Sequence, residues 1–227
     1  MAEKVIVLWS GGKDSALALY EILRAERYEV IGLLTTLTQD YDRISVHGVR
    51  RVLLEQQANG LGIPLEKMFI TKGASDADYE NELLKALGRH RANGVSSVLF
   101  GDIFLEDVRK FREQALTKAG MKGIFPLWHK PTKELACSFI NLGFKAIITV
   151  VDSNVLGKAF AGREFNEQFL SDLPANVDPC GENGEFHSFV YDGPIFRKRI
   201  FFEKGEIVLR ENRFYYCDLL PSKPTIG

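Results

Sequence analysis

The chain has 227 residues, a length that fits one large domain or two small ones. Its composition, 45% hydrophobic and 26% charged, is that of a globular protein with a sizeable core. The formal net charge of −1 gives no overall electrostatic reason to bind nucleic acid or an anionic membrane. We interpret the two local basic segments, residues 89–91 and 197–199, as solvated surface.

The three cysteines, Cys137, Cys180 and Cys217, are far apart in the sequence. They form no Cys-x-x-Cys pair and no zinc-like spacing, so we expect neither a disulfide framework nor a zinc site. The apolar run that follows the first four residues is too short for a signal peptide or a membrane span. We therefore expect a reduced, cytoplasmic protein without a membrane partner.

Strand-like and helix-like segments alternate along the first half of the chain. Buried-type strands are predicted over residues 5–9, 30–36, 69–71 and 96–100, and amphipathic helices over 15–24, 49–58, 77–91 and 106–119. This alternation favours an α/β fold with a doubly wound parallel sheet. Ligands of such sheets bind at the carboxyl ends of the strands, which is where Ser10, Gly101 and Asp102 fall.

The pattern changes after Trp128, where we expect a domain boundary. A helix over 133–141 and a strand over 146–151 are followed by a β-rich segment beyond Glu185. Hairpin-like turns are predicted at 204–205 and 211–212. We expect a first domain over 1–128 and a smaller α+β domain over 129–227.

The segment Ser-Gly-Gly-Lys-Asp-Ser, residues 10–15, joins the first strand to the first helix. Gly11 and Gly12 allow backbone N–H groups to approach an anion closely, and the start of the helix adds unpaired N–H groups and a positive dipole end. Ser10 and Ser15 add hydroxyl donors, and Lys13 adds a neutralising charge. The segment therefore predicts a phosphate-binding turn.

Asp14 does not suit a bare phosphate, because the two negative charges would repel each other. A cation between them, most plausibly Mg²⁺, removes that conflict. The spacing does not match the Walker motif, so a kinase-like or GTPase-like loop is a poor fit. The alternative without chemistry is an ordinary strand-to-helix turn in which Asp14 caps the helix.

With all six positions matched, this segment resembles the pyrophosphate loop of the N-type ATP pyrophosphatases. The resemblance implies that an oxygen of an acceptor attacks the α-phosphate, that pyrophosphate leaves, and that a nitrogen or sulfur nucleophile then displaces AMP. Sulfur-transferring members use a cysteine pair, and members with an N-terminal glutaminase need a cysteine after the initiator methionine. This chain has only distant cysteines and has Ala2, which weakens both of those interpretations.

A second glycine-rich segment, residues 177–196, packs Asp178, Glu182 and Glu185 among glycines. The flanking glycines make it a loop in which the acids could meet Mg²⁺, an ammonium group or a cationic substrate. An acidic surface turn before a strand is an equally good interpretation from the sequence alone. Both interpretations stay open.

Taken together, these segments resemble the diphthine–ammonia ligase (diphthamide synthetase) family. The likeness covers almost the whole chain through SGGKDS, HGV…LGIP, FGDI, PLW, LGK…AGRE and GENGEF. The family usually has Gly where this chain has Asn183, and we expect Asn to be accepted because it tolerates left-handed backbone angles. The resemblance implies an adenine nucleotide alpha hydrolase-like (HUP-type) first domain that binds ATP and a second domain that binds substrate.

The resemblance also implies a reaction and partners. A carboxylate is adenylated with ATP and Mg²⁺, and ammonia then displaces AMP to form an amide. The acceptor is diphthine on elongation factor 2 in archaea and eukaryotes. The form of the acidic loop resembles bacterial members, for which the acceptor is open. A homodimer is compatible with the sequence.

Residue roles follow from the resemblance as hypotheses. The expected nucleotide-binding residues are Ser10, Gly11, Gly12, Lys13, Asp14, Ser15, Thr35, Gly101, Asp102 and Arg112. Asp14 is the expected metal ligand, and Lys13, Asp14, Glu182 and Glu185 are the expected catalytic residues. The expected substrate-binding residues are Gly181, Glu182, Asn183, Gly184 and Glu185. We interpret His47 as a structural histidine and Cys180 as a small packed residue.

Three functions remain open from the sequence. The first is an ATP-dependent amide-forming ligase that releases AMP and pyrophosphate. The second is a tRNA-modifying ATP pyrophosphatase, which the near-neutral charge and the missing cysteine pair disfavour. The third is a non-catalytic module that binds an adenine nucleotide, against which the presence of both Lys13 and Asp14 argues.

Overall fold

The computed structural model describes residues 2–222, and its contacts divide the chain into two compact units. Unit 1 comprises Met1–Ser10, Asp14–Ser45 and Ile63–His129, and unit 2 comprises Gly11–Lys13, Val46–Gly62 and Lys130–Gly227. Three residues of the glycine turn thus belong to unit 2, whereas the residues on either side belong to unit 1. The assignment of ATP binding to residues 1–128 and of substrate binding to 129–227 stays a prediction, because it concerns ligands.

Unit 1 is built on one sheet with the strand order β3-β2-β1-β5-β6, in which β4 also pairs with β2. The strands are β1 (Glu3–Leu8), β2 (Tyr28–Thr38), β3 (Arg43–Ile44), β4 (Leu65–Ile70), β5 (Ser97–Leu99) and β6 (Lys122–Ile124). All neighbouring pairs are parallel except β2 with the short β3. The central strands are buried on both faces, as their continuous apolar sequences predict.

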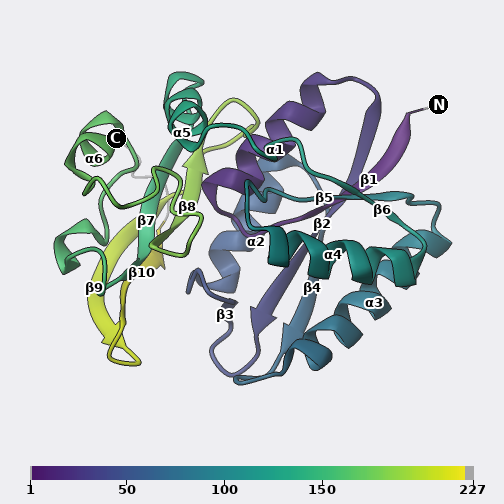
Figure 1. The fold of residues 1–227 in the computed structure, drawn as a ribbon, viewed down its shortest axis with the longest axis horizontal. Helices are drawn as coiled ribbons and strands as arrows, with labels where there is room; N and C mark the ends of the chain where they lie inside the picture. Colours follow the sequence, from purple (N-terminus) through teal and green to yellow (C-terminus); the bar gives the residue numbers. More distant parts are fainter. Residues whose placement is uncertain (1, 223–227) are drawn as a thin grey trace. The chain divides into compact units, whose positions relative to one another are not determined.

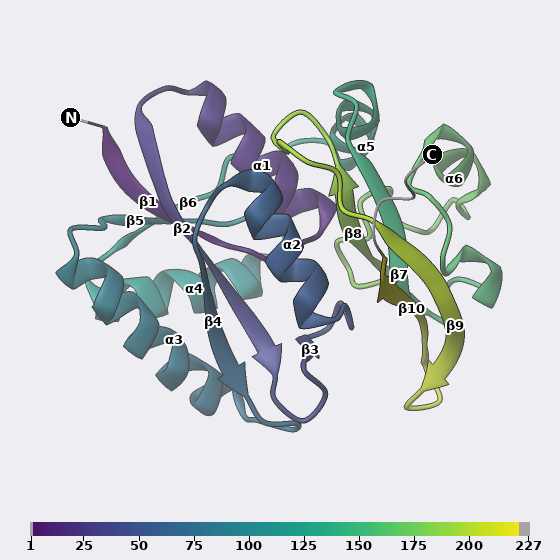
Figure 2. The ribbon, with the colours of Figure 1, turned by 180° about the vertical axis from the view of Figure 1, so that it is seen from behind.

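Helices cover both faces of this sheet. On one face, α3 (Asp76–Ala92) and α4 (Glu106–Ala119) lie in front in Figure 1 and pack Leu83, Leu87 and Leu116 against the strands. Helix α1 (Lys13–Arg24) lies on the opposite face, which is in front in Figure 2. The predicted doubly wound α/β fold is therefore confirmed.

Local sequence signals set the ends of these helices. Ser75 and Asp78 form a reciprocal capping box at the start of α3. Helix α4 ends at Gly120, which adopts the left-handed conformation with φ of 65°. In the part of the chain that the structure describes, no helix is long and apolar enough to cross a membrane.

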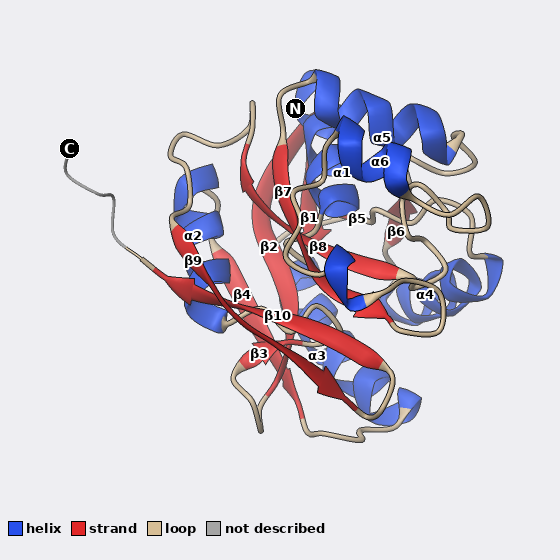
Figure 3. Ribbon diagram, turned by 90° about the vertical axis from the view of Figure 1, so that its left-hand side faces the viewer, coloured by secondary structure: helices blue, strands red, loops and turns tan. Residues whose placement is uncertain are grey.

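Unit 2 has an α+β fold, as expected, and its sheet is the smaller of the two, with four antiparallel strands in the order β8-β7-β10-β9 within the described residues. Its elements, coloured by type in Figure 3, are α2 (Arg51–Leu61), α5 (Thr132–Asn141), β7 (Lys145–Asp152), the 3₁₀ helix η1 (Lys158–Phe160), α6 (Glu167–Asp172), β8 (Phe186–Asp192), β9 (Phe202–Arg210) and β10 (Phe214–Pro221). A cluster of aromatic rings fills its core, and the rings come from α5, α6, β8 and the intervening loops: Phe139, Phe144, Phe165, Phe169 and Phe186.

One of the two predicted turns is wrong. Residues 204–205 lie inside β9, where a register shift opposite Cys217 and Leu219 absorbs the irregularity at Gly205. The turn at Glu211 and Asn212 is confirmed, because both residues have φ near 50° and connect β9 to β10. The third strand also begins earlier than its apolar residues suggest, at Leu65, where it pairs with β2.

Candidate functional site

The turn after β1 brings Ser10, Asp14 and Ser15 of unit 1 to the carboxyl end of the sheet. The hydroxyl oxygens of Ser10 and Ser15 lie 3.2 Å apart. Gly101, which follows β5, passes so close that a Cβ atom on it would lie 2.8 Å from the backbone nitrogen of Ser15. Only glycine fits there, so Gly101 allows the end of β5 to approach the start of α1.

Two polar atoms near these strand ends are buried without a hydrogen-bond partner in the described part of the chain: Thr35 Oγ1 and Asp102 Oδ2. Arg112 Nε lies 3.1 Å from Asp102 Oδ2, an ion-pair distance, but the alignment is not that of a hydrogen bond. The Arg112 guanidinium also lies 4.7 Å from the ring centroid of Phe100. Buried polar atoms are normally paired, so this arrangement fits the binding of a polar ligand.

The electrostatics of Asp102 fit a cation. Burial raises the pKa of the Asp102 carboxyl, Arg112 opposes the rise, and the negative charge of Asp14 adds to it. Two neighbouring carboxylates are stabilised together by a divalent cation. Within residues 2–222, no three His, Cys, Asp or Glu side chains gather as a complete metal site. Mg²⁺ does not need one, because it binds through one or two carboxylates plus phosphate oxygens and water.

In unit 2, the glycine turn is fastened by a buried glutamine. Gln57 Nε2, on α2, donates to the carbonyl of Gly11 at 2.9 Å and to the carbonyl of Val190 at 2.6 Å. The N–H of Val190 on β8 also donates to the Gly11 carbonyl, at 2.9 Å. Gly11 has φ of 75°, a backbone conformation that favours glycine. These bonds hold the turn by the carbonyl of Gly11.

Sequence reasoning missed Gln57, although a signal was present. Gln57 lies on the same helical face as Leu53, Leu54, Ala58 and Leu61, all of which are buried. A glutamine that interrupts an apolar helical face must find hydrogen-bond partners inside the protein. The two carbonyl groups bonded by Gln57 meet that requirement.

Lys13 is 4% exposed, and its contacts in unit 2 are to the protein itself. Its ammonium donates to the carbonyl of Cys180 and lies 5.4 Å from the ring centroid of Phe186. Its backbone N–H donates to Ser188 Oγ at 3.1 Å. Lys13 belongs to the glycine turn, and its ammonium is hydrogen-bonded to the acidic loop, residues 178–186. It therefore links the turn to the loop.

Within the acidic loop, Asp178 serves the loop itself. Its Oδ2 accepts hydrogen bonds from the backbone N–H groups of Cys180, at 3.1 Å, and Glu182, at 2.9 Å. Its carbonyl accepts from the N–H of Gly181 at 2.8 Å. Cys180 packs in the interior, where its Sγ lies 3.3 Å from the carbonyl of Thr132, as expected for a small packed residue.

Glu185 differs from Asp178, because one of its carboxylate oxygens accepts no hydrogen bond from the described residues. Its Oε1 accepts from the backbone N–H of Asp178 at 3.1 Å and from Asn183 Nδ2 at 2.9 Å. Its Oε2 is buried without a hydrogen-bond partner in the described part of the chain. The side chain is thus held in place with one acceptor unused.

The expected reason for Asn183 is wrong. Asn183 does not adopt a left-handed conformation; Gly181 and Gly184 on either side do, with φ of 67° and 86°. Asn183 instead contributes its side-chain amide, which donates to Glu185. The substitution of a family glycine therefore adds a hydrogen bond rather than a backbone angle.

Two histidines of unit 2, His47 and His187, lie with ring centroids 4.8 Å apart. Burial lowers the pKa of His47 to about 4, against a hydrogen bond with the Ser188 carbonyl that raises it, and the charge of Lys13 lowers it further. Burial, then the charges of His47 and Lys13, hold the pKa of His187 well below its ordinary value. Both imidazoles are therefore neutral at pH 7, which agrees with the interpretation of His47 as a structural residue.

The structure thus brings the sequence-predicted residues together in two groups, one in each unit. Unit 1 contains Ser10, Asp14, Ser15, Thr35, Gly101, Asp102 and Arg112. Unit 2 contains Gly11, Gly12, Lys13, Gly181, Glu182, Asn183, Gly184 and Glu185. A parallel sheet with a glycine turn after its first strand is typical of nucleotide-binding α/β proteins.

Two family models match this chain. The model described as diphthamide synthase N-terminal domain matches residues 3–123, and the model described as diphthamide synthase C-terminal domain matches residues 131–219. The chain belongs to the diphthamide synthase family. The family expected from the sequence motifs is therefore confirmed.

Curated relatives carry the name diphthine–ammonia ligase. The Danio rerio protein is 28% identical over 92% of this chain and 90% of its own length, and the human protein is 24% identical over 91% and 85%. The Schizosaccharomyces pombe protein is 27% identical over 90% of this chain, which spans only 37% of that longer protein. A solved structure described as a predicted subunit of tRNA methyltransferase from Methanocaldococcus jannaschii aligns with 63% of this chain and 77% of its own, at 22% identity and a TM-score of 0.42.

Proposed function

We propose that this protein is an ATP-dependent carbon–nitrogen ligase that adenylates a carboxylate, releases pyrophosphate and lets ammonia displace AMP. Membership of the diphthamide synthase family supports the reaction class. The structural observation that carries the proposal is a pair of buried oxygens without a hydrogen bond within the described residues of unit 1: Thr35 Oγ1 on β2, and Asp102 Oδ2 in the loop after β5. They accompany the glycine turn where a nucleotide is expected.

ATP and Mg²⁺ are the expected ligands of the first group of residues. The N–H groups of Gly11 and Gly12 and the hydroxyls of Ser10 and Ser15 would hold phosphate oxygens. Asp14 would hold Mg²⁺, and bound Mg²⁺ supplies neutralisation of the phosphate charge.

Asp102 and Arg112 have paired roles in this proposal. Asp102 would assist Asp14, since the pKa of the Asp102 carboxyl is raised by burial and by the charge of Asp14. Arg112 keeps the guanidinium near Asp102 and over Phe100, so it would meet a phosphate only after exchanging that ion pair. Thr35 Oγ1 would donate its hydroxyl to the nucleotide, which would give this buried atom a partner.

Lys13 has a different role from the one its sequence position suggests. The ammonium is bonded to the Cys180 carbonyl and buried beside Phe186, so it holds the acidic loop in position. We infer that the main role of Lys13 is to hold the acidic loop in place, so that this loop can position the acceptor. Charge neutralisation at the departing pyrophosphate would require the ammonium to leave this carbonyl.

Glu185 is the strongest candidate for handling the nucleophile. In the second step the C–N bond forms, the C–O bond to AMP breaks, and one proton must leave the attacking nitrogen. The unused Glu185 Oε2 can accept an N–H bond from ammonia while Oε1 keeps the side chain fixed. Glu182, whose backbone N–H is bound by Asp178, would help to position the acceptor.

The acceptor is proposed from the relatives. Proteins named diphthine–ammonia ligase act, by that name, on diphthine and ammonia, and we propose the same class of carboxylate acceptor here. Where diphthine on elongation factor 2 is absent, another carboxylate would take its place. Neither the tRNA-modifying alternative nor the non-catalytic alternative has an observation in its favour, and a homodimer stays a proposal.

The proposal is tested with ¹⁵N-labelled ammonium, ATP, Mg²⁺ and fractionated extract of the source cells. We expect ¹⁵N to enter one acceptor as an amide, with one AMP formed for each nitrogen incorporated. AMP formation without ¹⁵N incorporation in any fraction would exclude the ligase step. AMP formation stimulated by purified tRNA would favour the tRNA-modifying alternative instead.

A further inference from the structure

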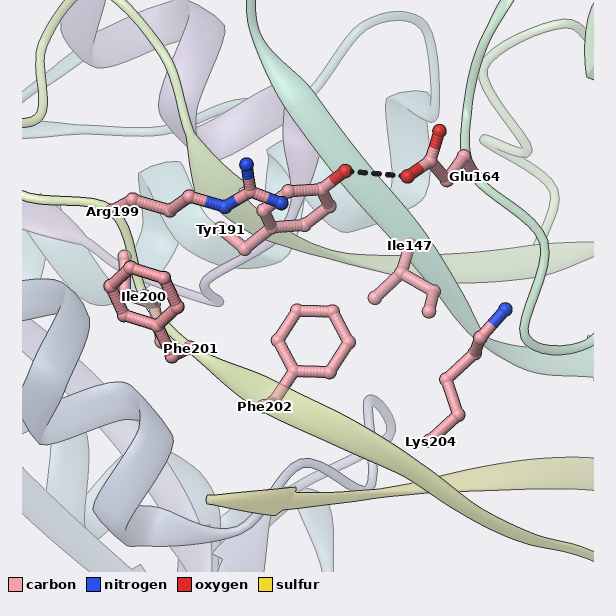
Figure 4. A pocket seen from close by; sticks show the side chains of 8 residues that line it. All are labelled: Ile147, Glu164, Tyr191, Arg199, Ile200, Phe201, Phe202 and Lys204. Atoms are coloured by element: carbon pink, nitrogen blue, oxygen red, sulfur yellow. Dashed lines mark hydrogen bonds between the residues drawn. The ribbon is translucent and has the colours of Figure 1, made fainter. Parts of the chain in front are cut away.

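Unit 2 contains a recess of about 190 Å³ that none of the residues assigned above lines. It lies along β7, β8 and the start of β9, and Figure 4 shows its side chains. The floor is apolar: Ile147 and Ile200 are 2% and 3% exposed, and the rings of Tyr191 and Phe202 meet edge to face with centroids 5.3 Å apart. Such a floor suits the apolar part of a small ligand.

The rim of the recess is charged, and its one acidic group already has a partner. The Tyr191 hydroxyl donates to Glu164 Oε1 at 2.9 Å, the bond drawn in Figure 4. Burial, the bond to Glu164 and the charge of Glu164 raise the pKa of Tyr191 to about 12, so the phenol keeps its proton at neutral pH. One oxygen of the Glu164 carboxylate therefore already accepts a hydrogen bond from within the recess.

The basic groups on the rim have fewer hydrogen-bond and ion-pair partners than they could accommodate. The Arg199 guanidinium lies 5.0 Å from the Tyr191 ring centroid and makes no ion pair or hydrogen bond with the described residues. Lys204 Nζ donates to the carbonyl of Gly162 at 3.2 Å, which occupies one of its three donors. Two cations thus offer unused donors beside an apolar floor.

The backbone of the basic segment, residues 197–199, is fixed. The N–H of Arg197 donates to the Gly60 carbonyl at 2.7 Å, and the N–H of Ile200 donates to the Tyr191 carbonyl at 2.8 Å. The backbone of Arg199 is consequently held in place beside the recess. All three residues of the segment are exposed, as expected from the sequence, and Arg199 also lines the recess.

We propose that the recess binds a small carboxylate with an aromatic or branched apolar body, whose carboxylate pairs with Arg199. The guanidinium fork supplies charge-assisted hydrogen bonds, and Tyr191 and Phe202 contact the apolar body, while Lys204 lies on the other side of the recess (Figure 4). The volume is below the ~300–1,000 Å³ of usual ligand pockets, so the ligand has about the size of a phenyl ring with a short chain. This site does not depend on the proposed ATP chemistry, because it uses none of the same residues.

The test uses three matched probes and the intact protein, followed by the amide signals of ¹H–¹⁵N NMR spectra. 3-Phenylpropanoate should shift the amides of Tyr191 and Phe202 saturably. 3-Phenylpropan-1-amine has the same body with the opposite charge, and propanoate has the charge without the body, so both should bind at least tenfold more weakly. Equal binding of the amine, or shifts confined to other residues, would overturn the proposal.

Variants test whether binding depends on the charge of Arg199 itself or on the overall positive charge of the surface around the recess. Arg199→Gln should weaken 3-phenylpropanoate binding at least tenfold. Lys198→Gln removes the same charge from the neighbouring position, which does not line the recess, and should change binding less than twofold. Glu164→Gln should strengthen binding, because it removes the one negative charge on the rim. If the Arg199 and Lys198 variants behave alike, Arg199 does not recognise the carboxylate.

Discussion

Asp102 of unit 1 and Asp178 of unit 2 both lie in loops that contain glycine, yet their carboxylates have opposite hydrogen-bonding patterns. Asp102 is partly buried, its Oδ2 is buried without a hydrogen bond within the described residues, and its pKa is raised by burial and by Asp14. Asp178 uses its carboxylate to accept two backbone N–H groups of its own loop. The difference teaches that hydrogen-bond accounting, rather than residue type, shows which acid is available to a ligand.

The same accounting separates Asp178 from Glu185 within one loop. Both carboxylates accept backbone N–H groups, but only Glu185 keeps a buried oxygen without a partner in the described part of the chain. We therefore assign Asp178 a structural role, which is to hold the loop, and Glu185 a role in the reaction. The predictions below, from the largest effect to the smallest, test this division.

The largest effect is expected at Asp14. Asp14→Asn removes the proposed Mg²⁺ ligand while keeping shape, so AMP formation should fall about 1,000-fold, or roughly 4 kcal/mol in barrier height. Mg²⁺-dependent ATP binding, measured by calorimetry, should weaken as well. Asp107→Asn, an exposed aspartate in the first turn of α4, is the control and should retain full activity. Normal turnover of the Asp14 variant would refute its assignment.

Glu185→Gln should separate binding from chemistry. Glutamine keeps an oxygen for Asp178 and Asn183 but replaces the unused carboxylate oxygen with an amide. ATP affinity should stay within about twofold, while ammonia-dependent turnover falls about 100-fold. Glu206→Gln, on the exposed side of β9, serves as the control. A loss of ATP affinity would place Glu185 at the nucleotide instead.

Asp178→Ala should act mainly on stability. It leaves the N–H groups of Cys180 and Glu182 without their acceptor, so the free energy of unfolding in urea should drop by about 2 kcal/mol. Asp172→Ala removes an exposed ion pair with Arg163 and should lower the free energy of unfolding much less. Equal losses in the two variants would mean that the loop does not depend on Asp178.

The histidine pair predicts a loss of stability in acid. Because the pKa of His47 is lowered to about 4 in the folded chain, its neutral form contributes stability that is complete above pH 6.5 and is lost as the pH falls toward 4. Between pH 7 and pH 5 this amounts to about 2 kcal/mol. Urea unfolding at the two pH values should show a smaller loss for His47→Gln. The exposed His129→Gln variant should keep the full loss, and an unchanged loss in His47→Gln would contradict the assignment.

Much of the fold could be predicted because strong local signals agreed with one another. Helix α4 begins and ends at the predicted residues, where Gly120 stops it. The turn at residues 204–205 failed because a Lys-Gly pair looks like a hairpin, whereas the pairing of β9 with β10 continues past it through a register shift. Local composition cannot reveal pairing with a distant strand.

The site was predicted in part for a similar reason. The glycine turn and the acidic loop were found because glycines and charges stand together in the sequence. Gln57, Ser188 and His187 were missed because each acts through contacts with residues more than 40 positions away. The position of the Lys13 ammonium at the Cys180 carbonyl could not be predicted from the six-residue motif either.

The central claim is that ATP is cut between its α- and β-phosphates. The direct measurement is incubation of the protein with α-³²P-labelled ATP, Mg²⁺, ammonium and the acceptor-containing fraction, followed by separation of the labelled nucleotides. We predict labelled AMP, with one pyrophosphate per AMP, and about 1,000-fold slower formation of labelled AMP by the Asp14→Asn variant. Labelled ADP in place of AMP would contradict the account.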